Sequence, residues 1–274
     1  MRKHLLRSLI LTVFVAMAVL AVSVNTNADS EGYPTCDLNE QLVVGILWYQ
    51  KSAEMRALSY QAFGMARLMF DIDLQKRTSD KGRAVVVDID ETVLNNSPYE
   101  AGLISKDIGY PTGWAQWIDE AAAEPLPGAI EFLNYVVENG ADVFYVSNRK
   151  ARFKEATMKN LKAFGFPQVS DAHVLLRENT SDKEPRRQKV REDHRIVLLI
   201  GDNLNDFDSI FRKKGIDERL AAVDRLKDKF GTAFIVLPNP MYGDWEGAIY
   251  DYDWKMNPQQ KNQARKSSLA AWNQ

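Results

Sequence analysis

The chain of 274 residues has one cysteine, three histidines and no excess of basic residues. Because Cys36 is the only cysteine, a disulfide cannot form within one chain, and stability has to come from a packed core. Acidic residues slightly outnumber basic ones, and the net charge is −2, so the sequence carries no electrostatic footprint for a nucleic-acid polymer. The sequence also lacks a Gly-x-Gly-x-x-Gly loop, which binds dinucleotide phosphates in other proteins.

Residues 1–28 have the pattern of a secretory signal peptide. Three basic residues precede a nearly unbroken apolar run from Leu9 to Val24. Small residues in Thr26-Asn27-Ala28 fit a cleavage site, and Ala21-Val22-Ser23 offers a second one. The alternative is an uncleaved membrane anchor, but the run is shorter than the ~20 residues that span a bilayer. We therefore expect export and a single mature domain of residues 29–274.

Cys36 raises the question of a lipid anchor, because an early cysteine after an export signal can carry lipid. A lipidated cysteine usually follows a small-residue tripeptide such as Leu-Ala-Gly. Cys36 instead follows Tyr33-Pro34-Thr35 and lies well beyond the apolar run. We therefore expect a free thiol and no stable membrane anchor, with the protein in the periplasm or outside the cell.

The stretch from Ala84 to Thr92 is the part of the sequence around which the rest is organised. Its apolar run up to Val87 predicts a strand that is buried on both faces, and Asp88 and Asp90 come after it. A carboxylate at the end of a buried strand is costly unless a metal ion or another charge pairs with it. Open α/β sheets bind ligands at the carboxyl ends of their strands. The sequence therefore predicts an acidic site at this strand tip.

Two later apolar runs also end in polar residues. Residues 143–146 lead into Ser147-Asn148-Arg149, and residues 196–200 lead into Gly201-Asp202-Asn203-Leu204-Asn205-Asp206. Between them, Lys183 lies in a charge-rich stretch, residues 178–195, for which we expect a helix with one solvated face. If the strands are parallel, all these polar ends share one edge of the sheet with Asp88.

The alternation of strand-like and helix-like segments predicts an α/β fold, a three-layer sandwich with a parallel sheet and a small helical cap. A helical arm from about residue 39 to 74 precedes the central strand, and an insert near residues 95–124 comes after it. Further strands are expected at residues 173–176 and 232–237, and helices at 128–139, 153–164, from about 207, and at 221–230.

In their order along the chain, Asp-x-Asp-x-Thr, Ser-Asn, Lys and Gly-Asp-x-x-x-Asp resemble the motifs of the haloacid dehalogenase (HAD) superfamily of phosphohydrolases. The resemblance implies that Asp88 attacks the phosphate and forms an aspartyl-phosphate. Asp90 would bind the metal through its backbone carbonyl, while its side chain protonates the leaving group and later deprotonates water. Asp202 would add a second carboxylate to the metal, and ligands that are all oxygen favour Mg²⁺. The insert would then form the cap.

The remaining motif residues receive supporting roles from the same resemblance. Ser147 and Asn148 would bind phosphate oxygens, and Lys183 would offset the anionic charge. Asp206 would orient Lys183 or a metal-bound water. For Thr92 and Asn148, a turn or helix cap is an equally good interpretation. Histidine-based and cysteine-based phosphatase chemistry is disfavoured, because neither residue type occurs in the motifs that such chemistry requires.

Longer stretches are similar to the class C acid phosphatases, a family that includes bacterial lipoprotein 5′-nucleotidases. They are Asp88–Tyr99, Phe144–Lys150, Gly201–Phe207 and Leu237–Gly247, and with residues 49–70 the similarity covers nearly all of the mature chain. It implies Mg²⁺-dependent hydrolysis of nucleoside 5′-monophosphates and other small phosphomonoesters at acid pH. Two departures are the sequence before Cys36, which lacks a lipidation motif, and Ser147, which stands where threonine is common and keeps the hydroxyl.

Aromatic residues in two loops are candidates for binding a nucleotide base, together with Trp245. The resemblance places base-stacking residues at Trp114 and Tyr242, and both lie in loops marked by glycine and proline after strand ends. The alternative is that these rings belong to the core, which applies most to Trp117 and Trp245.

Two other functions compete with phosphomonoester hydrolysis. A phosphotransferase would use the same aspartyl-phosphate but pass the phosphoryl group to an alcohol. A non-catalytic surface-binding protein would be a hydrolase scaffold without its catalytic carboxylates, and all three carboxylates of the motifs are present. The expected partners are small phosphomonoesters, and a homodimer is a further possibility.

Overall fold

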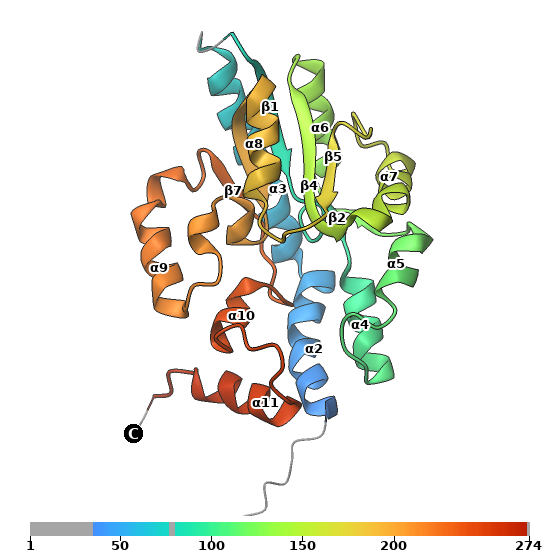
Figure 1. The fold of residues 1–274 in the computed structure, drawn as a ribbon, viewed down its shortest axis with the longest axis vertical. Helices are drawn as coiled ribbons and strands as arrows, with labels where there is room; N and C mark the ends of the chain where they lie inside the picture. The colour runs from blue at the N-terminus through green and yellow to red at the C-terminus, as the bar shows by residue number, and fades with distance from the viewer. Residues whose placement is uncertain (1–34, 77–79, 273–274) are drawn as a thin grey trace, which may run out of the picture. The chain divides into compact units, whose positions relative to one another are not determined.

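The computed structural model describes residues 35–76 and 80–272, and the predicted signal segment and the Cys36 side chain lie outside this description. The centre of the domain is a sheet of five parallel strands in the order β5-β4-β1-β6-β7 (Figure 1). These are β1 (Gly82–Val87), β4 (Asp142–Lys150), β5 (Val174–Arg177), β6 (His194–Gly201) and β7 (Phe234–Val236).

Helices cover both faces of this sheet. On one face α3 (Ala53–Leu74) and α6 (Ala129–Glu138) contact each other and the strands, and on the other face α8 (Glu184–Asp193) contacts β1, β4 and β6. Alternate residues of β1 supply the two core layers, as expected for a strand. Val85 belongs to the apolar cluster that contains Phe70 of α3, and Val86 belongs to the cluster that contains Val190 of α8. The predicted three-layer α/β sandwich is confirmed.

The register of the central strands brings their carboxyl ends to one level. Val87, the last residue of β1, pairs with Tyr145 on β4 and with Ile200 on β6. Asp88 follows Val87 directly, and Ser147 and Asp202 come two residues after Tyr145 and Ile200, so these polar residues share one edge of the sheet.

The predicted helical arm is two helices, α2 (Thr35–Lys51) and α3. The chain is extended at Ser52, and the Ser52 hydroxyl accepts a hydrogen bond from the Met55 backbone N–H at 3.0 Å. Serine is a favoured residue for this capping position, so α3 starts anew here. The arm reaches the acidic loop, because the Tyr49 hydroxyl donates to the Glu91 carbonyl at 3.4 Å.

The insert after β1 contains α4 (Ser97–Lys106) and α5 (Trp114–Glu120). A short antiparallel pair, β2 (Leu94–Asn95) and β3 (Glu124–Pro125), closes its base. The insert therefore leaves and rejoins the domain at one place, directly beside the end of β1.

The sequence-based predictions are wrong for the segment after β6. In place of a helix from about residue 207 there are two 3₁₀ turns, η2 (Leu204–Asp206) and η3 (Ser209–Phe211). The next helix, α9 (Ile216–Arg225), starts earlier than predicted, because the Glu218 carboxylate accepts the Gly215 backbone N–H at 3.2 Å and fixes the first turn.

The remaining elements complete the domain. They are η1 (Ala151–Phe153), α7 (Lys154–Ala163), η4 (Lys227–Lys229), α10 (Asp244–Ile249) and α11 (Pro258–Ser267). Within residues 35–76 and 80–272, no helix combines the length and the apolar composition needed to cross a membrane.

Candidate active site

Asp88 lies at the end of the central strand, where the sequence predicted an acidic site. Its backbone N–H still pairs with the Ile200 carbonyl at 2.9 Å, so β6 holds it in the sheet. The chain then turns sharply, because the backbone N–H groups of Val93 and Leu94 both donate to the Ile89 carbonyl. Asp88 is only 8% exposed, so its carboxylate is largely removed from bulk water.

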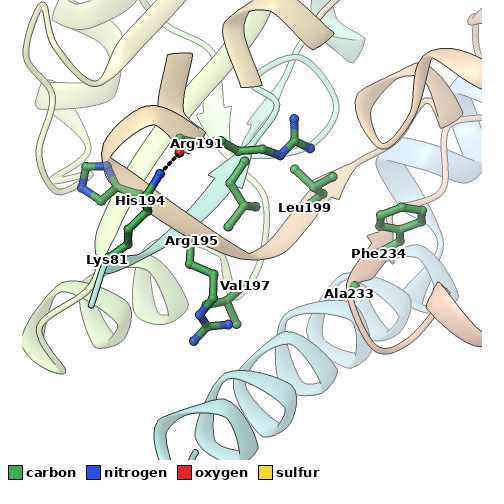
Figure 2. A pocket seen from close by; sticks show the side chains of 9 residues that line it. Lys81, Arg191, His194, Arg195, Val197, Leu199, Ala233 and Phe234 are labelled. Atoms are coloured by element: carbon green, nitrogen blue, oxygen red, sulfur yellow. Dashed lines mark hydrogen bonds between the residues drawn. The ribbon is translucent and has the colours of Figure 1, made fainter. Parts of the chain in front are cut away.

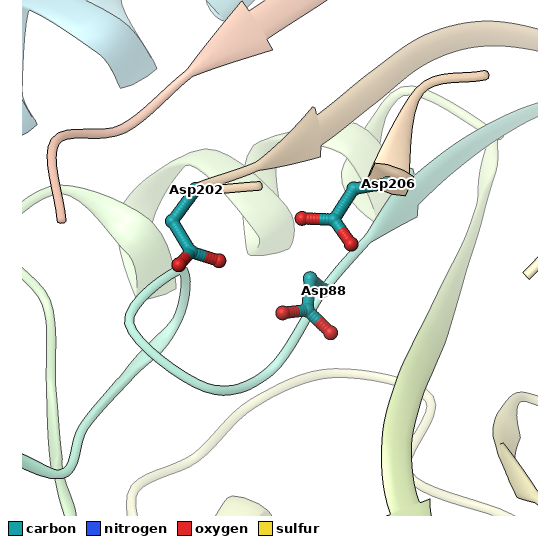
Figure 3. A group of neighbouring side chains, drawn as sticks. All are labelled: Asp88, Asp202 and Asp206. Carbon is teal, nitrogen blue, oxygen red and sulfur yellow. The ribbon is translucent and has the colours of Figure 1, made fainter. Parts of the chain in front are cut away.

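Three carboxylates meet at this edge of the sheet (Figure 3). One ligand oxygen each of Asp88, Asp202 and Asp206 lies within 4.8 Å of the others. Asp202 comes directly after β6, and Asp206 belongs to the 3₁₀ turn η2. Gly201 makes this approach possible, since a Cβ atom at position 201 would overlap the Asp206 side chain. The structure therefore brings together two aspartates that the sequence places far from Asp88.

Lys183 is the cation that contacts this cluster. Its Nζ lies 2.5 Å from Asp88 and 2.6 Å from Asp206, and its side chain is 4% exposed. Lys183 occupies the N-cap of α8, the helix that packs on β1, β4 and β6. The position of Lys183 agrees with its predicted role of offsetting anionic charge.

One lysine cannot balance three buried carboxylates. Burial raises the pKa of Asp88 to about 7, with Asp206 and Asp90 adding to the shift and Lys183 opposing it. Burial, Asp206 and Asp88 likewise raise the pKa of Asp202 well above its usual range. The pKa of Lys183 is raised, because the attraction of Asp206 and Asp88 outweighs burial. A divalent cation would offset the excess negative charge, and the carboxylate donor set fits a hard cation such as Mg²⁺.

Asp202 is held by two side-chain donors from other parts of the chain. The Asn239 amide donates to one carboxylate oxygen at 2.8 Å, and the Thr92 hydroxyl donates to the other at 3.3 Å. For Thr92 this contact favours a supporting role in the site over a simple turn cap.

Asp90 points into a separate network beside the carboxylate cluster. The Arg149 Nε donates to its Oδ1 at 2.9 Å, the Asn96 amide donates to the same oxygen at 2.8 Å, and the Ser147 hydroxyl donates to Oδ2 at 3.3 Å. Arg149 is 3% exposed, so this ion pair is buried at the arginine end. The contacts fix the orientation of the Asp90 carboxylate.

Ser147 and Asn148 point in different directions, as neighbours on a strand do. The Asn148 amide donates to the Ser181 carbonyl at 3.0 Å. The Arg186 guanidinium donates to the Ser147 carbonyl at 2.5 Å and to the Asn148 side-chain oxygen at 2.7 Å. Ser147 therefore faces Asp90, while Asn148 is engaged with the loop before α8.

The two predicted base-binding rings are both connected to the site. The Arg149 guanidinium lies over the Trp114 ring at 5.6 Å from its centroid, and Trp114 is half-buried. Tyr242 is half-buried as well, and its backbone N–H donates to the side chain of Asn239, the residue that holds Asp202. Trp245 is 43% exposed, so the alternative of a core residue is wrong for it.

Sequence reasoning assigned no role to four residues of this network: Asn96, Arg149, Arg186 and Asn239. Arg149 comes after Ser147-Asn148 in the motif, and an arginine at the end of an apolar strand was a usable signal. No feature of the sequence distinguishes Arg186 from the other charged residues of the helix in which it lies.

A hollow of about 390 Å³ lies along β6, from the start of the strand as far as Leu199, and none of the three clustered aspartates lines it (Figure 2). Its lining includes His194 and Arg195, which begin β6, whereas Asp202 lies just past the end of the same strand. The basic residues His194 and Arg195 of this hollow therefore lie at the edge of the sheet opposite the acidic site.

Comparisons with known proteins agree with this arrangement. Acid phosphatase 1 from Solanum lycopersicum is 28% identical over 178 residues, and the match covers 60% of this chain and 60% of that protein. The chain thus spans less than two thirds of this relative. Vegetative storage protein 1 from Arabidopsis thaliana is 26% identical over 167 residues, which cover 57% of this chain and 54% of that protein.

The structural match is more extensive. The structure of the class C acid phosphatase from Bacillus anthracis is 45% identical, superposes with a TM-score of 0.84, and covers 86% of this chain and 99% of its own. A structure of that protein with tungstate bound matches to the same extent. The family model described as HAD superfamily, subfamily IIIB (acid phosphatase), matches residues 3–245. The chain therefore belongs to subfamily IIIB of the haloacid dehalogenase superfamily, the acid phosphatases, and has the fold of a class C acid phosphatase.

Proposed function

We propose that the protein is a Mg²⁺-dependent phosphomonoesterase that uses Asp88 as its nucleophile and prefers nucleoside 5′-monophosphates. The observation that carries the proposal is the position of Asp88. It lies at the tip of the central strand, in contact with Lys183 and within one cluster with Asp202 and Asp206. The family assignment supports the phosphatase activity, and the residue roles, the metal and the substrate preference are our inference.

In the first step an Asp88 oxygen bonds to phosphorus and the ester oxygen leaves. The step gives an aspartyl-phosphate and an alkoxide that needs a proton. Lys183 lies 2.5 Å from Asp88, so it can offset charge on the phosphoryl oxygens while they approach a carboxylate. Asp206 holds the other side of Lys183 at 2.6 Å and thereby fixes the ammonium group in place.

Asp90 is the group suited to move the proton. Its carboxylate is oriented by Arg149, Asn96 and Ser147, and it comes two residues after the nucleophile. We infer that Asp90 donates its proton to the leaving alkoxide. In the second step it takes a proton from the water that attacks the phosphorus, which releases phosphate and restores Asp88.

The metal would be held by the side chains of Asp88 and Asp202 and by the backbone carbonyl of Asp90. When bound, Mg²⁺ supplies positive charge that lets an anionic nucleophile approach an anionic phosphate. Thr92 and Asn239 hold the Asp202 carboxylate with hydrogen bonds of 3.3 Å and 2.8 Å, as ligand carboxylates in metal sites commonly are.

The nucleotide preference rests on Trp114 and Tyr242. One is in contact with Arg149, which binds Asp90, and the other is linked through Asn239 to Asp202. We infer that these two rings receive the base when the phosphate is bound at Asp88. Trp245, whose indole N–H donates to the Tyr242 carbonyl at 3.2 Å, supports the second of these rings.

Export without a lipid anchor completes the proposal, and it rests only on residues 1–36 of the sequence. Mass spectrometry of the native N-terminus tests it. We expect a terminus created by cleavage after Ala28 or Ser23, and a terminal Cys36 that carries diacylglycerol would overturn this part of the proposal.

A phosphate-release screen of the mature protein tests the activity. The panel contains nucleoside 5′-monophosphates, sugar phosphates and glycerol phosphate, each with and without Mg²⁺, and added nucleoside reveals any phosphoryl transfer. We expect release of phosphate that requires Mg²⁺ and is fastest with nucleotides. Uniform inactivity on the whole panel would contradict the proposal, and phosphorylation of the added nucleoside would favour a phosphotransferase.

A further inference from the structure

A second hollow opens beside the reaction site, at the carboxyl ends of β4 and β5. It has a volume of about 670 Å³, and we call it the basic pocket. Its lining consists of Lys150, Ala151, Arg152, Arg177, Glu178, Asn179, Thr180, Ser181 and Arg212. Four of these side chains are cationic and one is anionic, in a chain whose net charge is −2.

The cations of the basic pocket form no ion pairs in the part of the chain that the structure describes. None of Lys150, Arg152 and Arg177 forms an ion pair there, and neither does Arg212. Lys150 and Arg177 are register partners on neighbouring parallel strands, so the sheet itself sets them side by side. Arg212 is tethered to the Ser181 hydroxyl at 3.2 Å. Positive charge is thus gathered around an open volume, and the protein offsets only part of it: Glu178 lies in the lining, and Arg212 acts to lower the pKa of Asp182 and of Asp244.

The basic pocket adjoins the reaction site through the wall that carries Asn148. The Asn148 amide donates to the carbonyl of Ser181, which lines the pocket, and Lys150 lies three residues beyond Ser147 on the same strand. At about 3.3 Å per residue, this separates Lys150 from Ser147 by about 10 Å along β4. Because Ser147 contacts Asp90, we expect a substrate of nucleotide size to extend from the reaction site to the pocket.

The basic pocket also borders the aromatic side of the site. Burial raises the pKa of the Tyr110 hydroxyl, and Arg177 lies close enough to oppose this shift in part. The Tyr110 ring lies 6.1 Å from that of Trp114. Arg177 of the basic pocket therefore lies next to the pair of rings formed by Tyr110 and Trp114.

We propose that the basic pocket binds a second phosphate group, so that the enzyme favours nucleoside bisphosphates over nucleoside monophosphates. The inference rests on the proposed function, because it places the first phosphate at Asp88. Arginine and lysine are the side chains that recognise phosphate, arginine through paired hydrogen bonds. The side chains of Lys150 and Arg152 are exposed, so solvent and salt screen the attraction, and we expect a gain of about tenfold in affinity at low salt.

The first test compares two substrates in matched variants. Wild-type protein should show a kcat/KM for adenosine 3′,5′-bisphosphate about tenfold above that for 5′-AMP at low salt. The double variant Lys150→Gln/Arg152→Gln should bring this ratio close to one. The control variant Lys159→Gln/Lys162→Gln removes the same charge from exposed positions on α7 and should keep the wild-type ratio. Equal ratios in both double variants would overturn the inference.

The second test measures binding without turnover. Calorimetry on the Asp88→Asn variant gives the Kd of each nucleotide even if no ester is hydrolysed, so failure of the proposed function and failure of this inference are distinguishable. We expect adenosine 3′,5′-bisphosphate to bind about tenfold more tightly than 5′-AMP, with the difference falling as salt rises and absent in Asp88→Asn/Lys150→Gln/Arg152→Gln. The same Kd for both nucleotides at low salt would refute a second phosphate site.

Discussion

The two edges of the central sheet differ in the number of cations that contact their buried aspartates. At the amino edge, Asp73 at the end of α3 is bound by Arg83 at 2.8 Å and by Arg195 at 2.6 Å. At the carboxyl edge, Asp88 shares one lysine with Asp206 and faces Asp202. Cations outnumber carboxylates at the first edge, and carboxylates outnumber cations at the second.

The pKa shifts reflect this difference. Burial acts to raise the pKa of Asp73, but its hydrogen bonds with Arg195 and Arg83 outweigh burial and lower it. At Asp88 burial dominates and raises the pKa to about 7. The amino edge is therefore built for stability. The carboxyl edge holds charge that the protein alone does not neutralise, as expected of a site that binds a cation and reacts with a phosphate.

The largest expected effect comes from Asp88→Asn. The substitution removes the attacking charge and keeps the size of the side chain, so kcat should fall by at least about 1000-fold. The melting temperature should stay the same or rise, because a buried carboxylate near two others is removed. Retention of a tenth of the wild-type kcat by the pure variant would show that Asp88 is not the nucleophile.

Removal of metal should have the next largest effect. EDTA should abolish most activity, and Mg²⁺ should restore it. Mg²⁺ at about 100 times its Kd should stabilise the native state by about 2.7 kcal/mol, which a thermal shift assay can detect. Asp73→Asn serves as control and should keep the full Mg²⁺ response, because this residue lies at the other edge. Undiminished turnover in a metal-free preparation would rule out the metal site.

At the amino edge we expect Asp73→Asn to reduce stability by about 1–2 kcal/mol and to leave kcat unchanged. The pKa of Asp73 is lowered in the folded state, so its contribution is present above the unfolded value of 3.8 and is lost as pH falls through the folded pKa. Denaturant unfolding of both proteins from pH 7 to pH 3 measures this. The difference between them should shrink below pH 3.8. A difference in stability that grows toward low pH would contradict the lowered pKa of Asp73.

The smallest expected effect comes from the aromatic rings at the carboxyl edge. It distinguishes their contribution to substrate binding from that of the charged residues. Trp114→Ala or Tyr242→Ala should raise KM for nucleoside 5′-monophosphates about tenfold, which corresponds to about 1.4 kcal/mol and lies within the range for stacking on one ring. KM for glycerol phosphate should change little. An equal loss on both substrates, or a large fall in melting temperature, would assign these rings to the core.

The sequence predicted the carboxyl edge well because its determinants are local. Apolar runs end at Val87, Val146 and Ile200, and parallel strands place the residues after these ends at one edge, so Asp88 and Asp202 had to lie close together. The starts of α3 and α9 were not predicted. Each start is fixed by one side-chain hydrogen bond, from the Met55 N–H to Ser52 and from the Gly215 N–H to Glu218, and the apolar periodicity of the sequence does not indicate such bonds.

Apart from Lys183, the partners of the carboxylates were not predicted, because they come from distant parts of the chain. Asn239 reaches Asp202, and Arg149 reaches Asp90, only after the sheet and the loops around it have formed. The same holds for Asp73 and Arg195, whose ion pair joins a helix to the start of a strand. The spacing of residues along the sequence does not indicate such pairs. The ratio of cations to carboxylates at each edge is therefore known only from the structure.

Trapping of the covalent intermediate tests the central claim most directly. The Asp90→Asn variant should still form the aspartyl-phosphate from p-nitrophenyl phosphate, whose leaving group needs no proton, but should hydrolyse it slowly. Borohydride added during turnover reduces an aspartyl-phosphate to homoserine, and peptide mass spectrometry locates the change. We predict homoserine at position 88, with none in Asp88→Asn/Asp90→Asn. Reduction at any other position, or unmodified Asp88 in a variant that releases p-nitrophenol in a burst, would contradict the account.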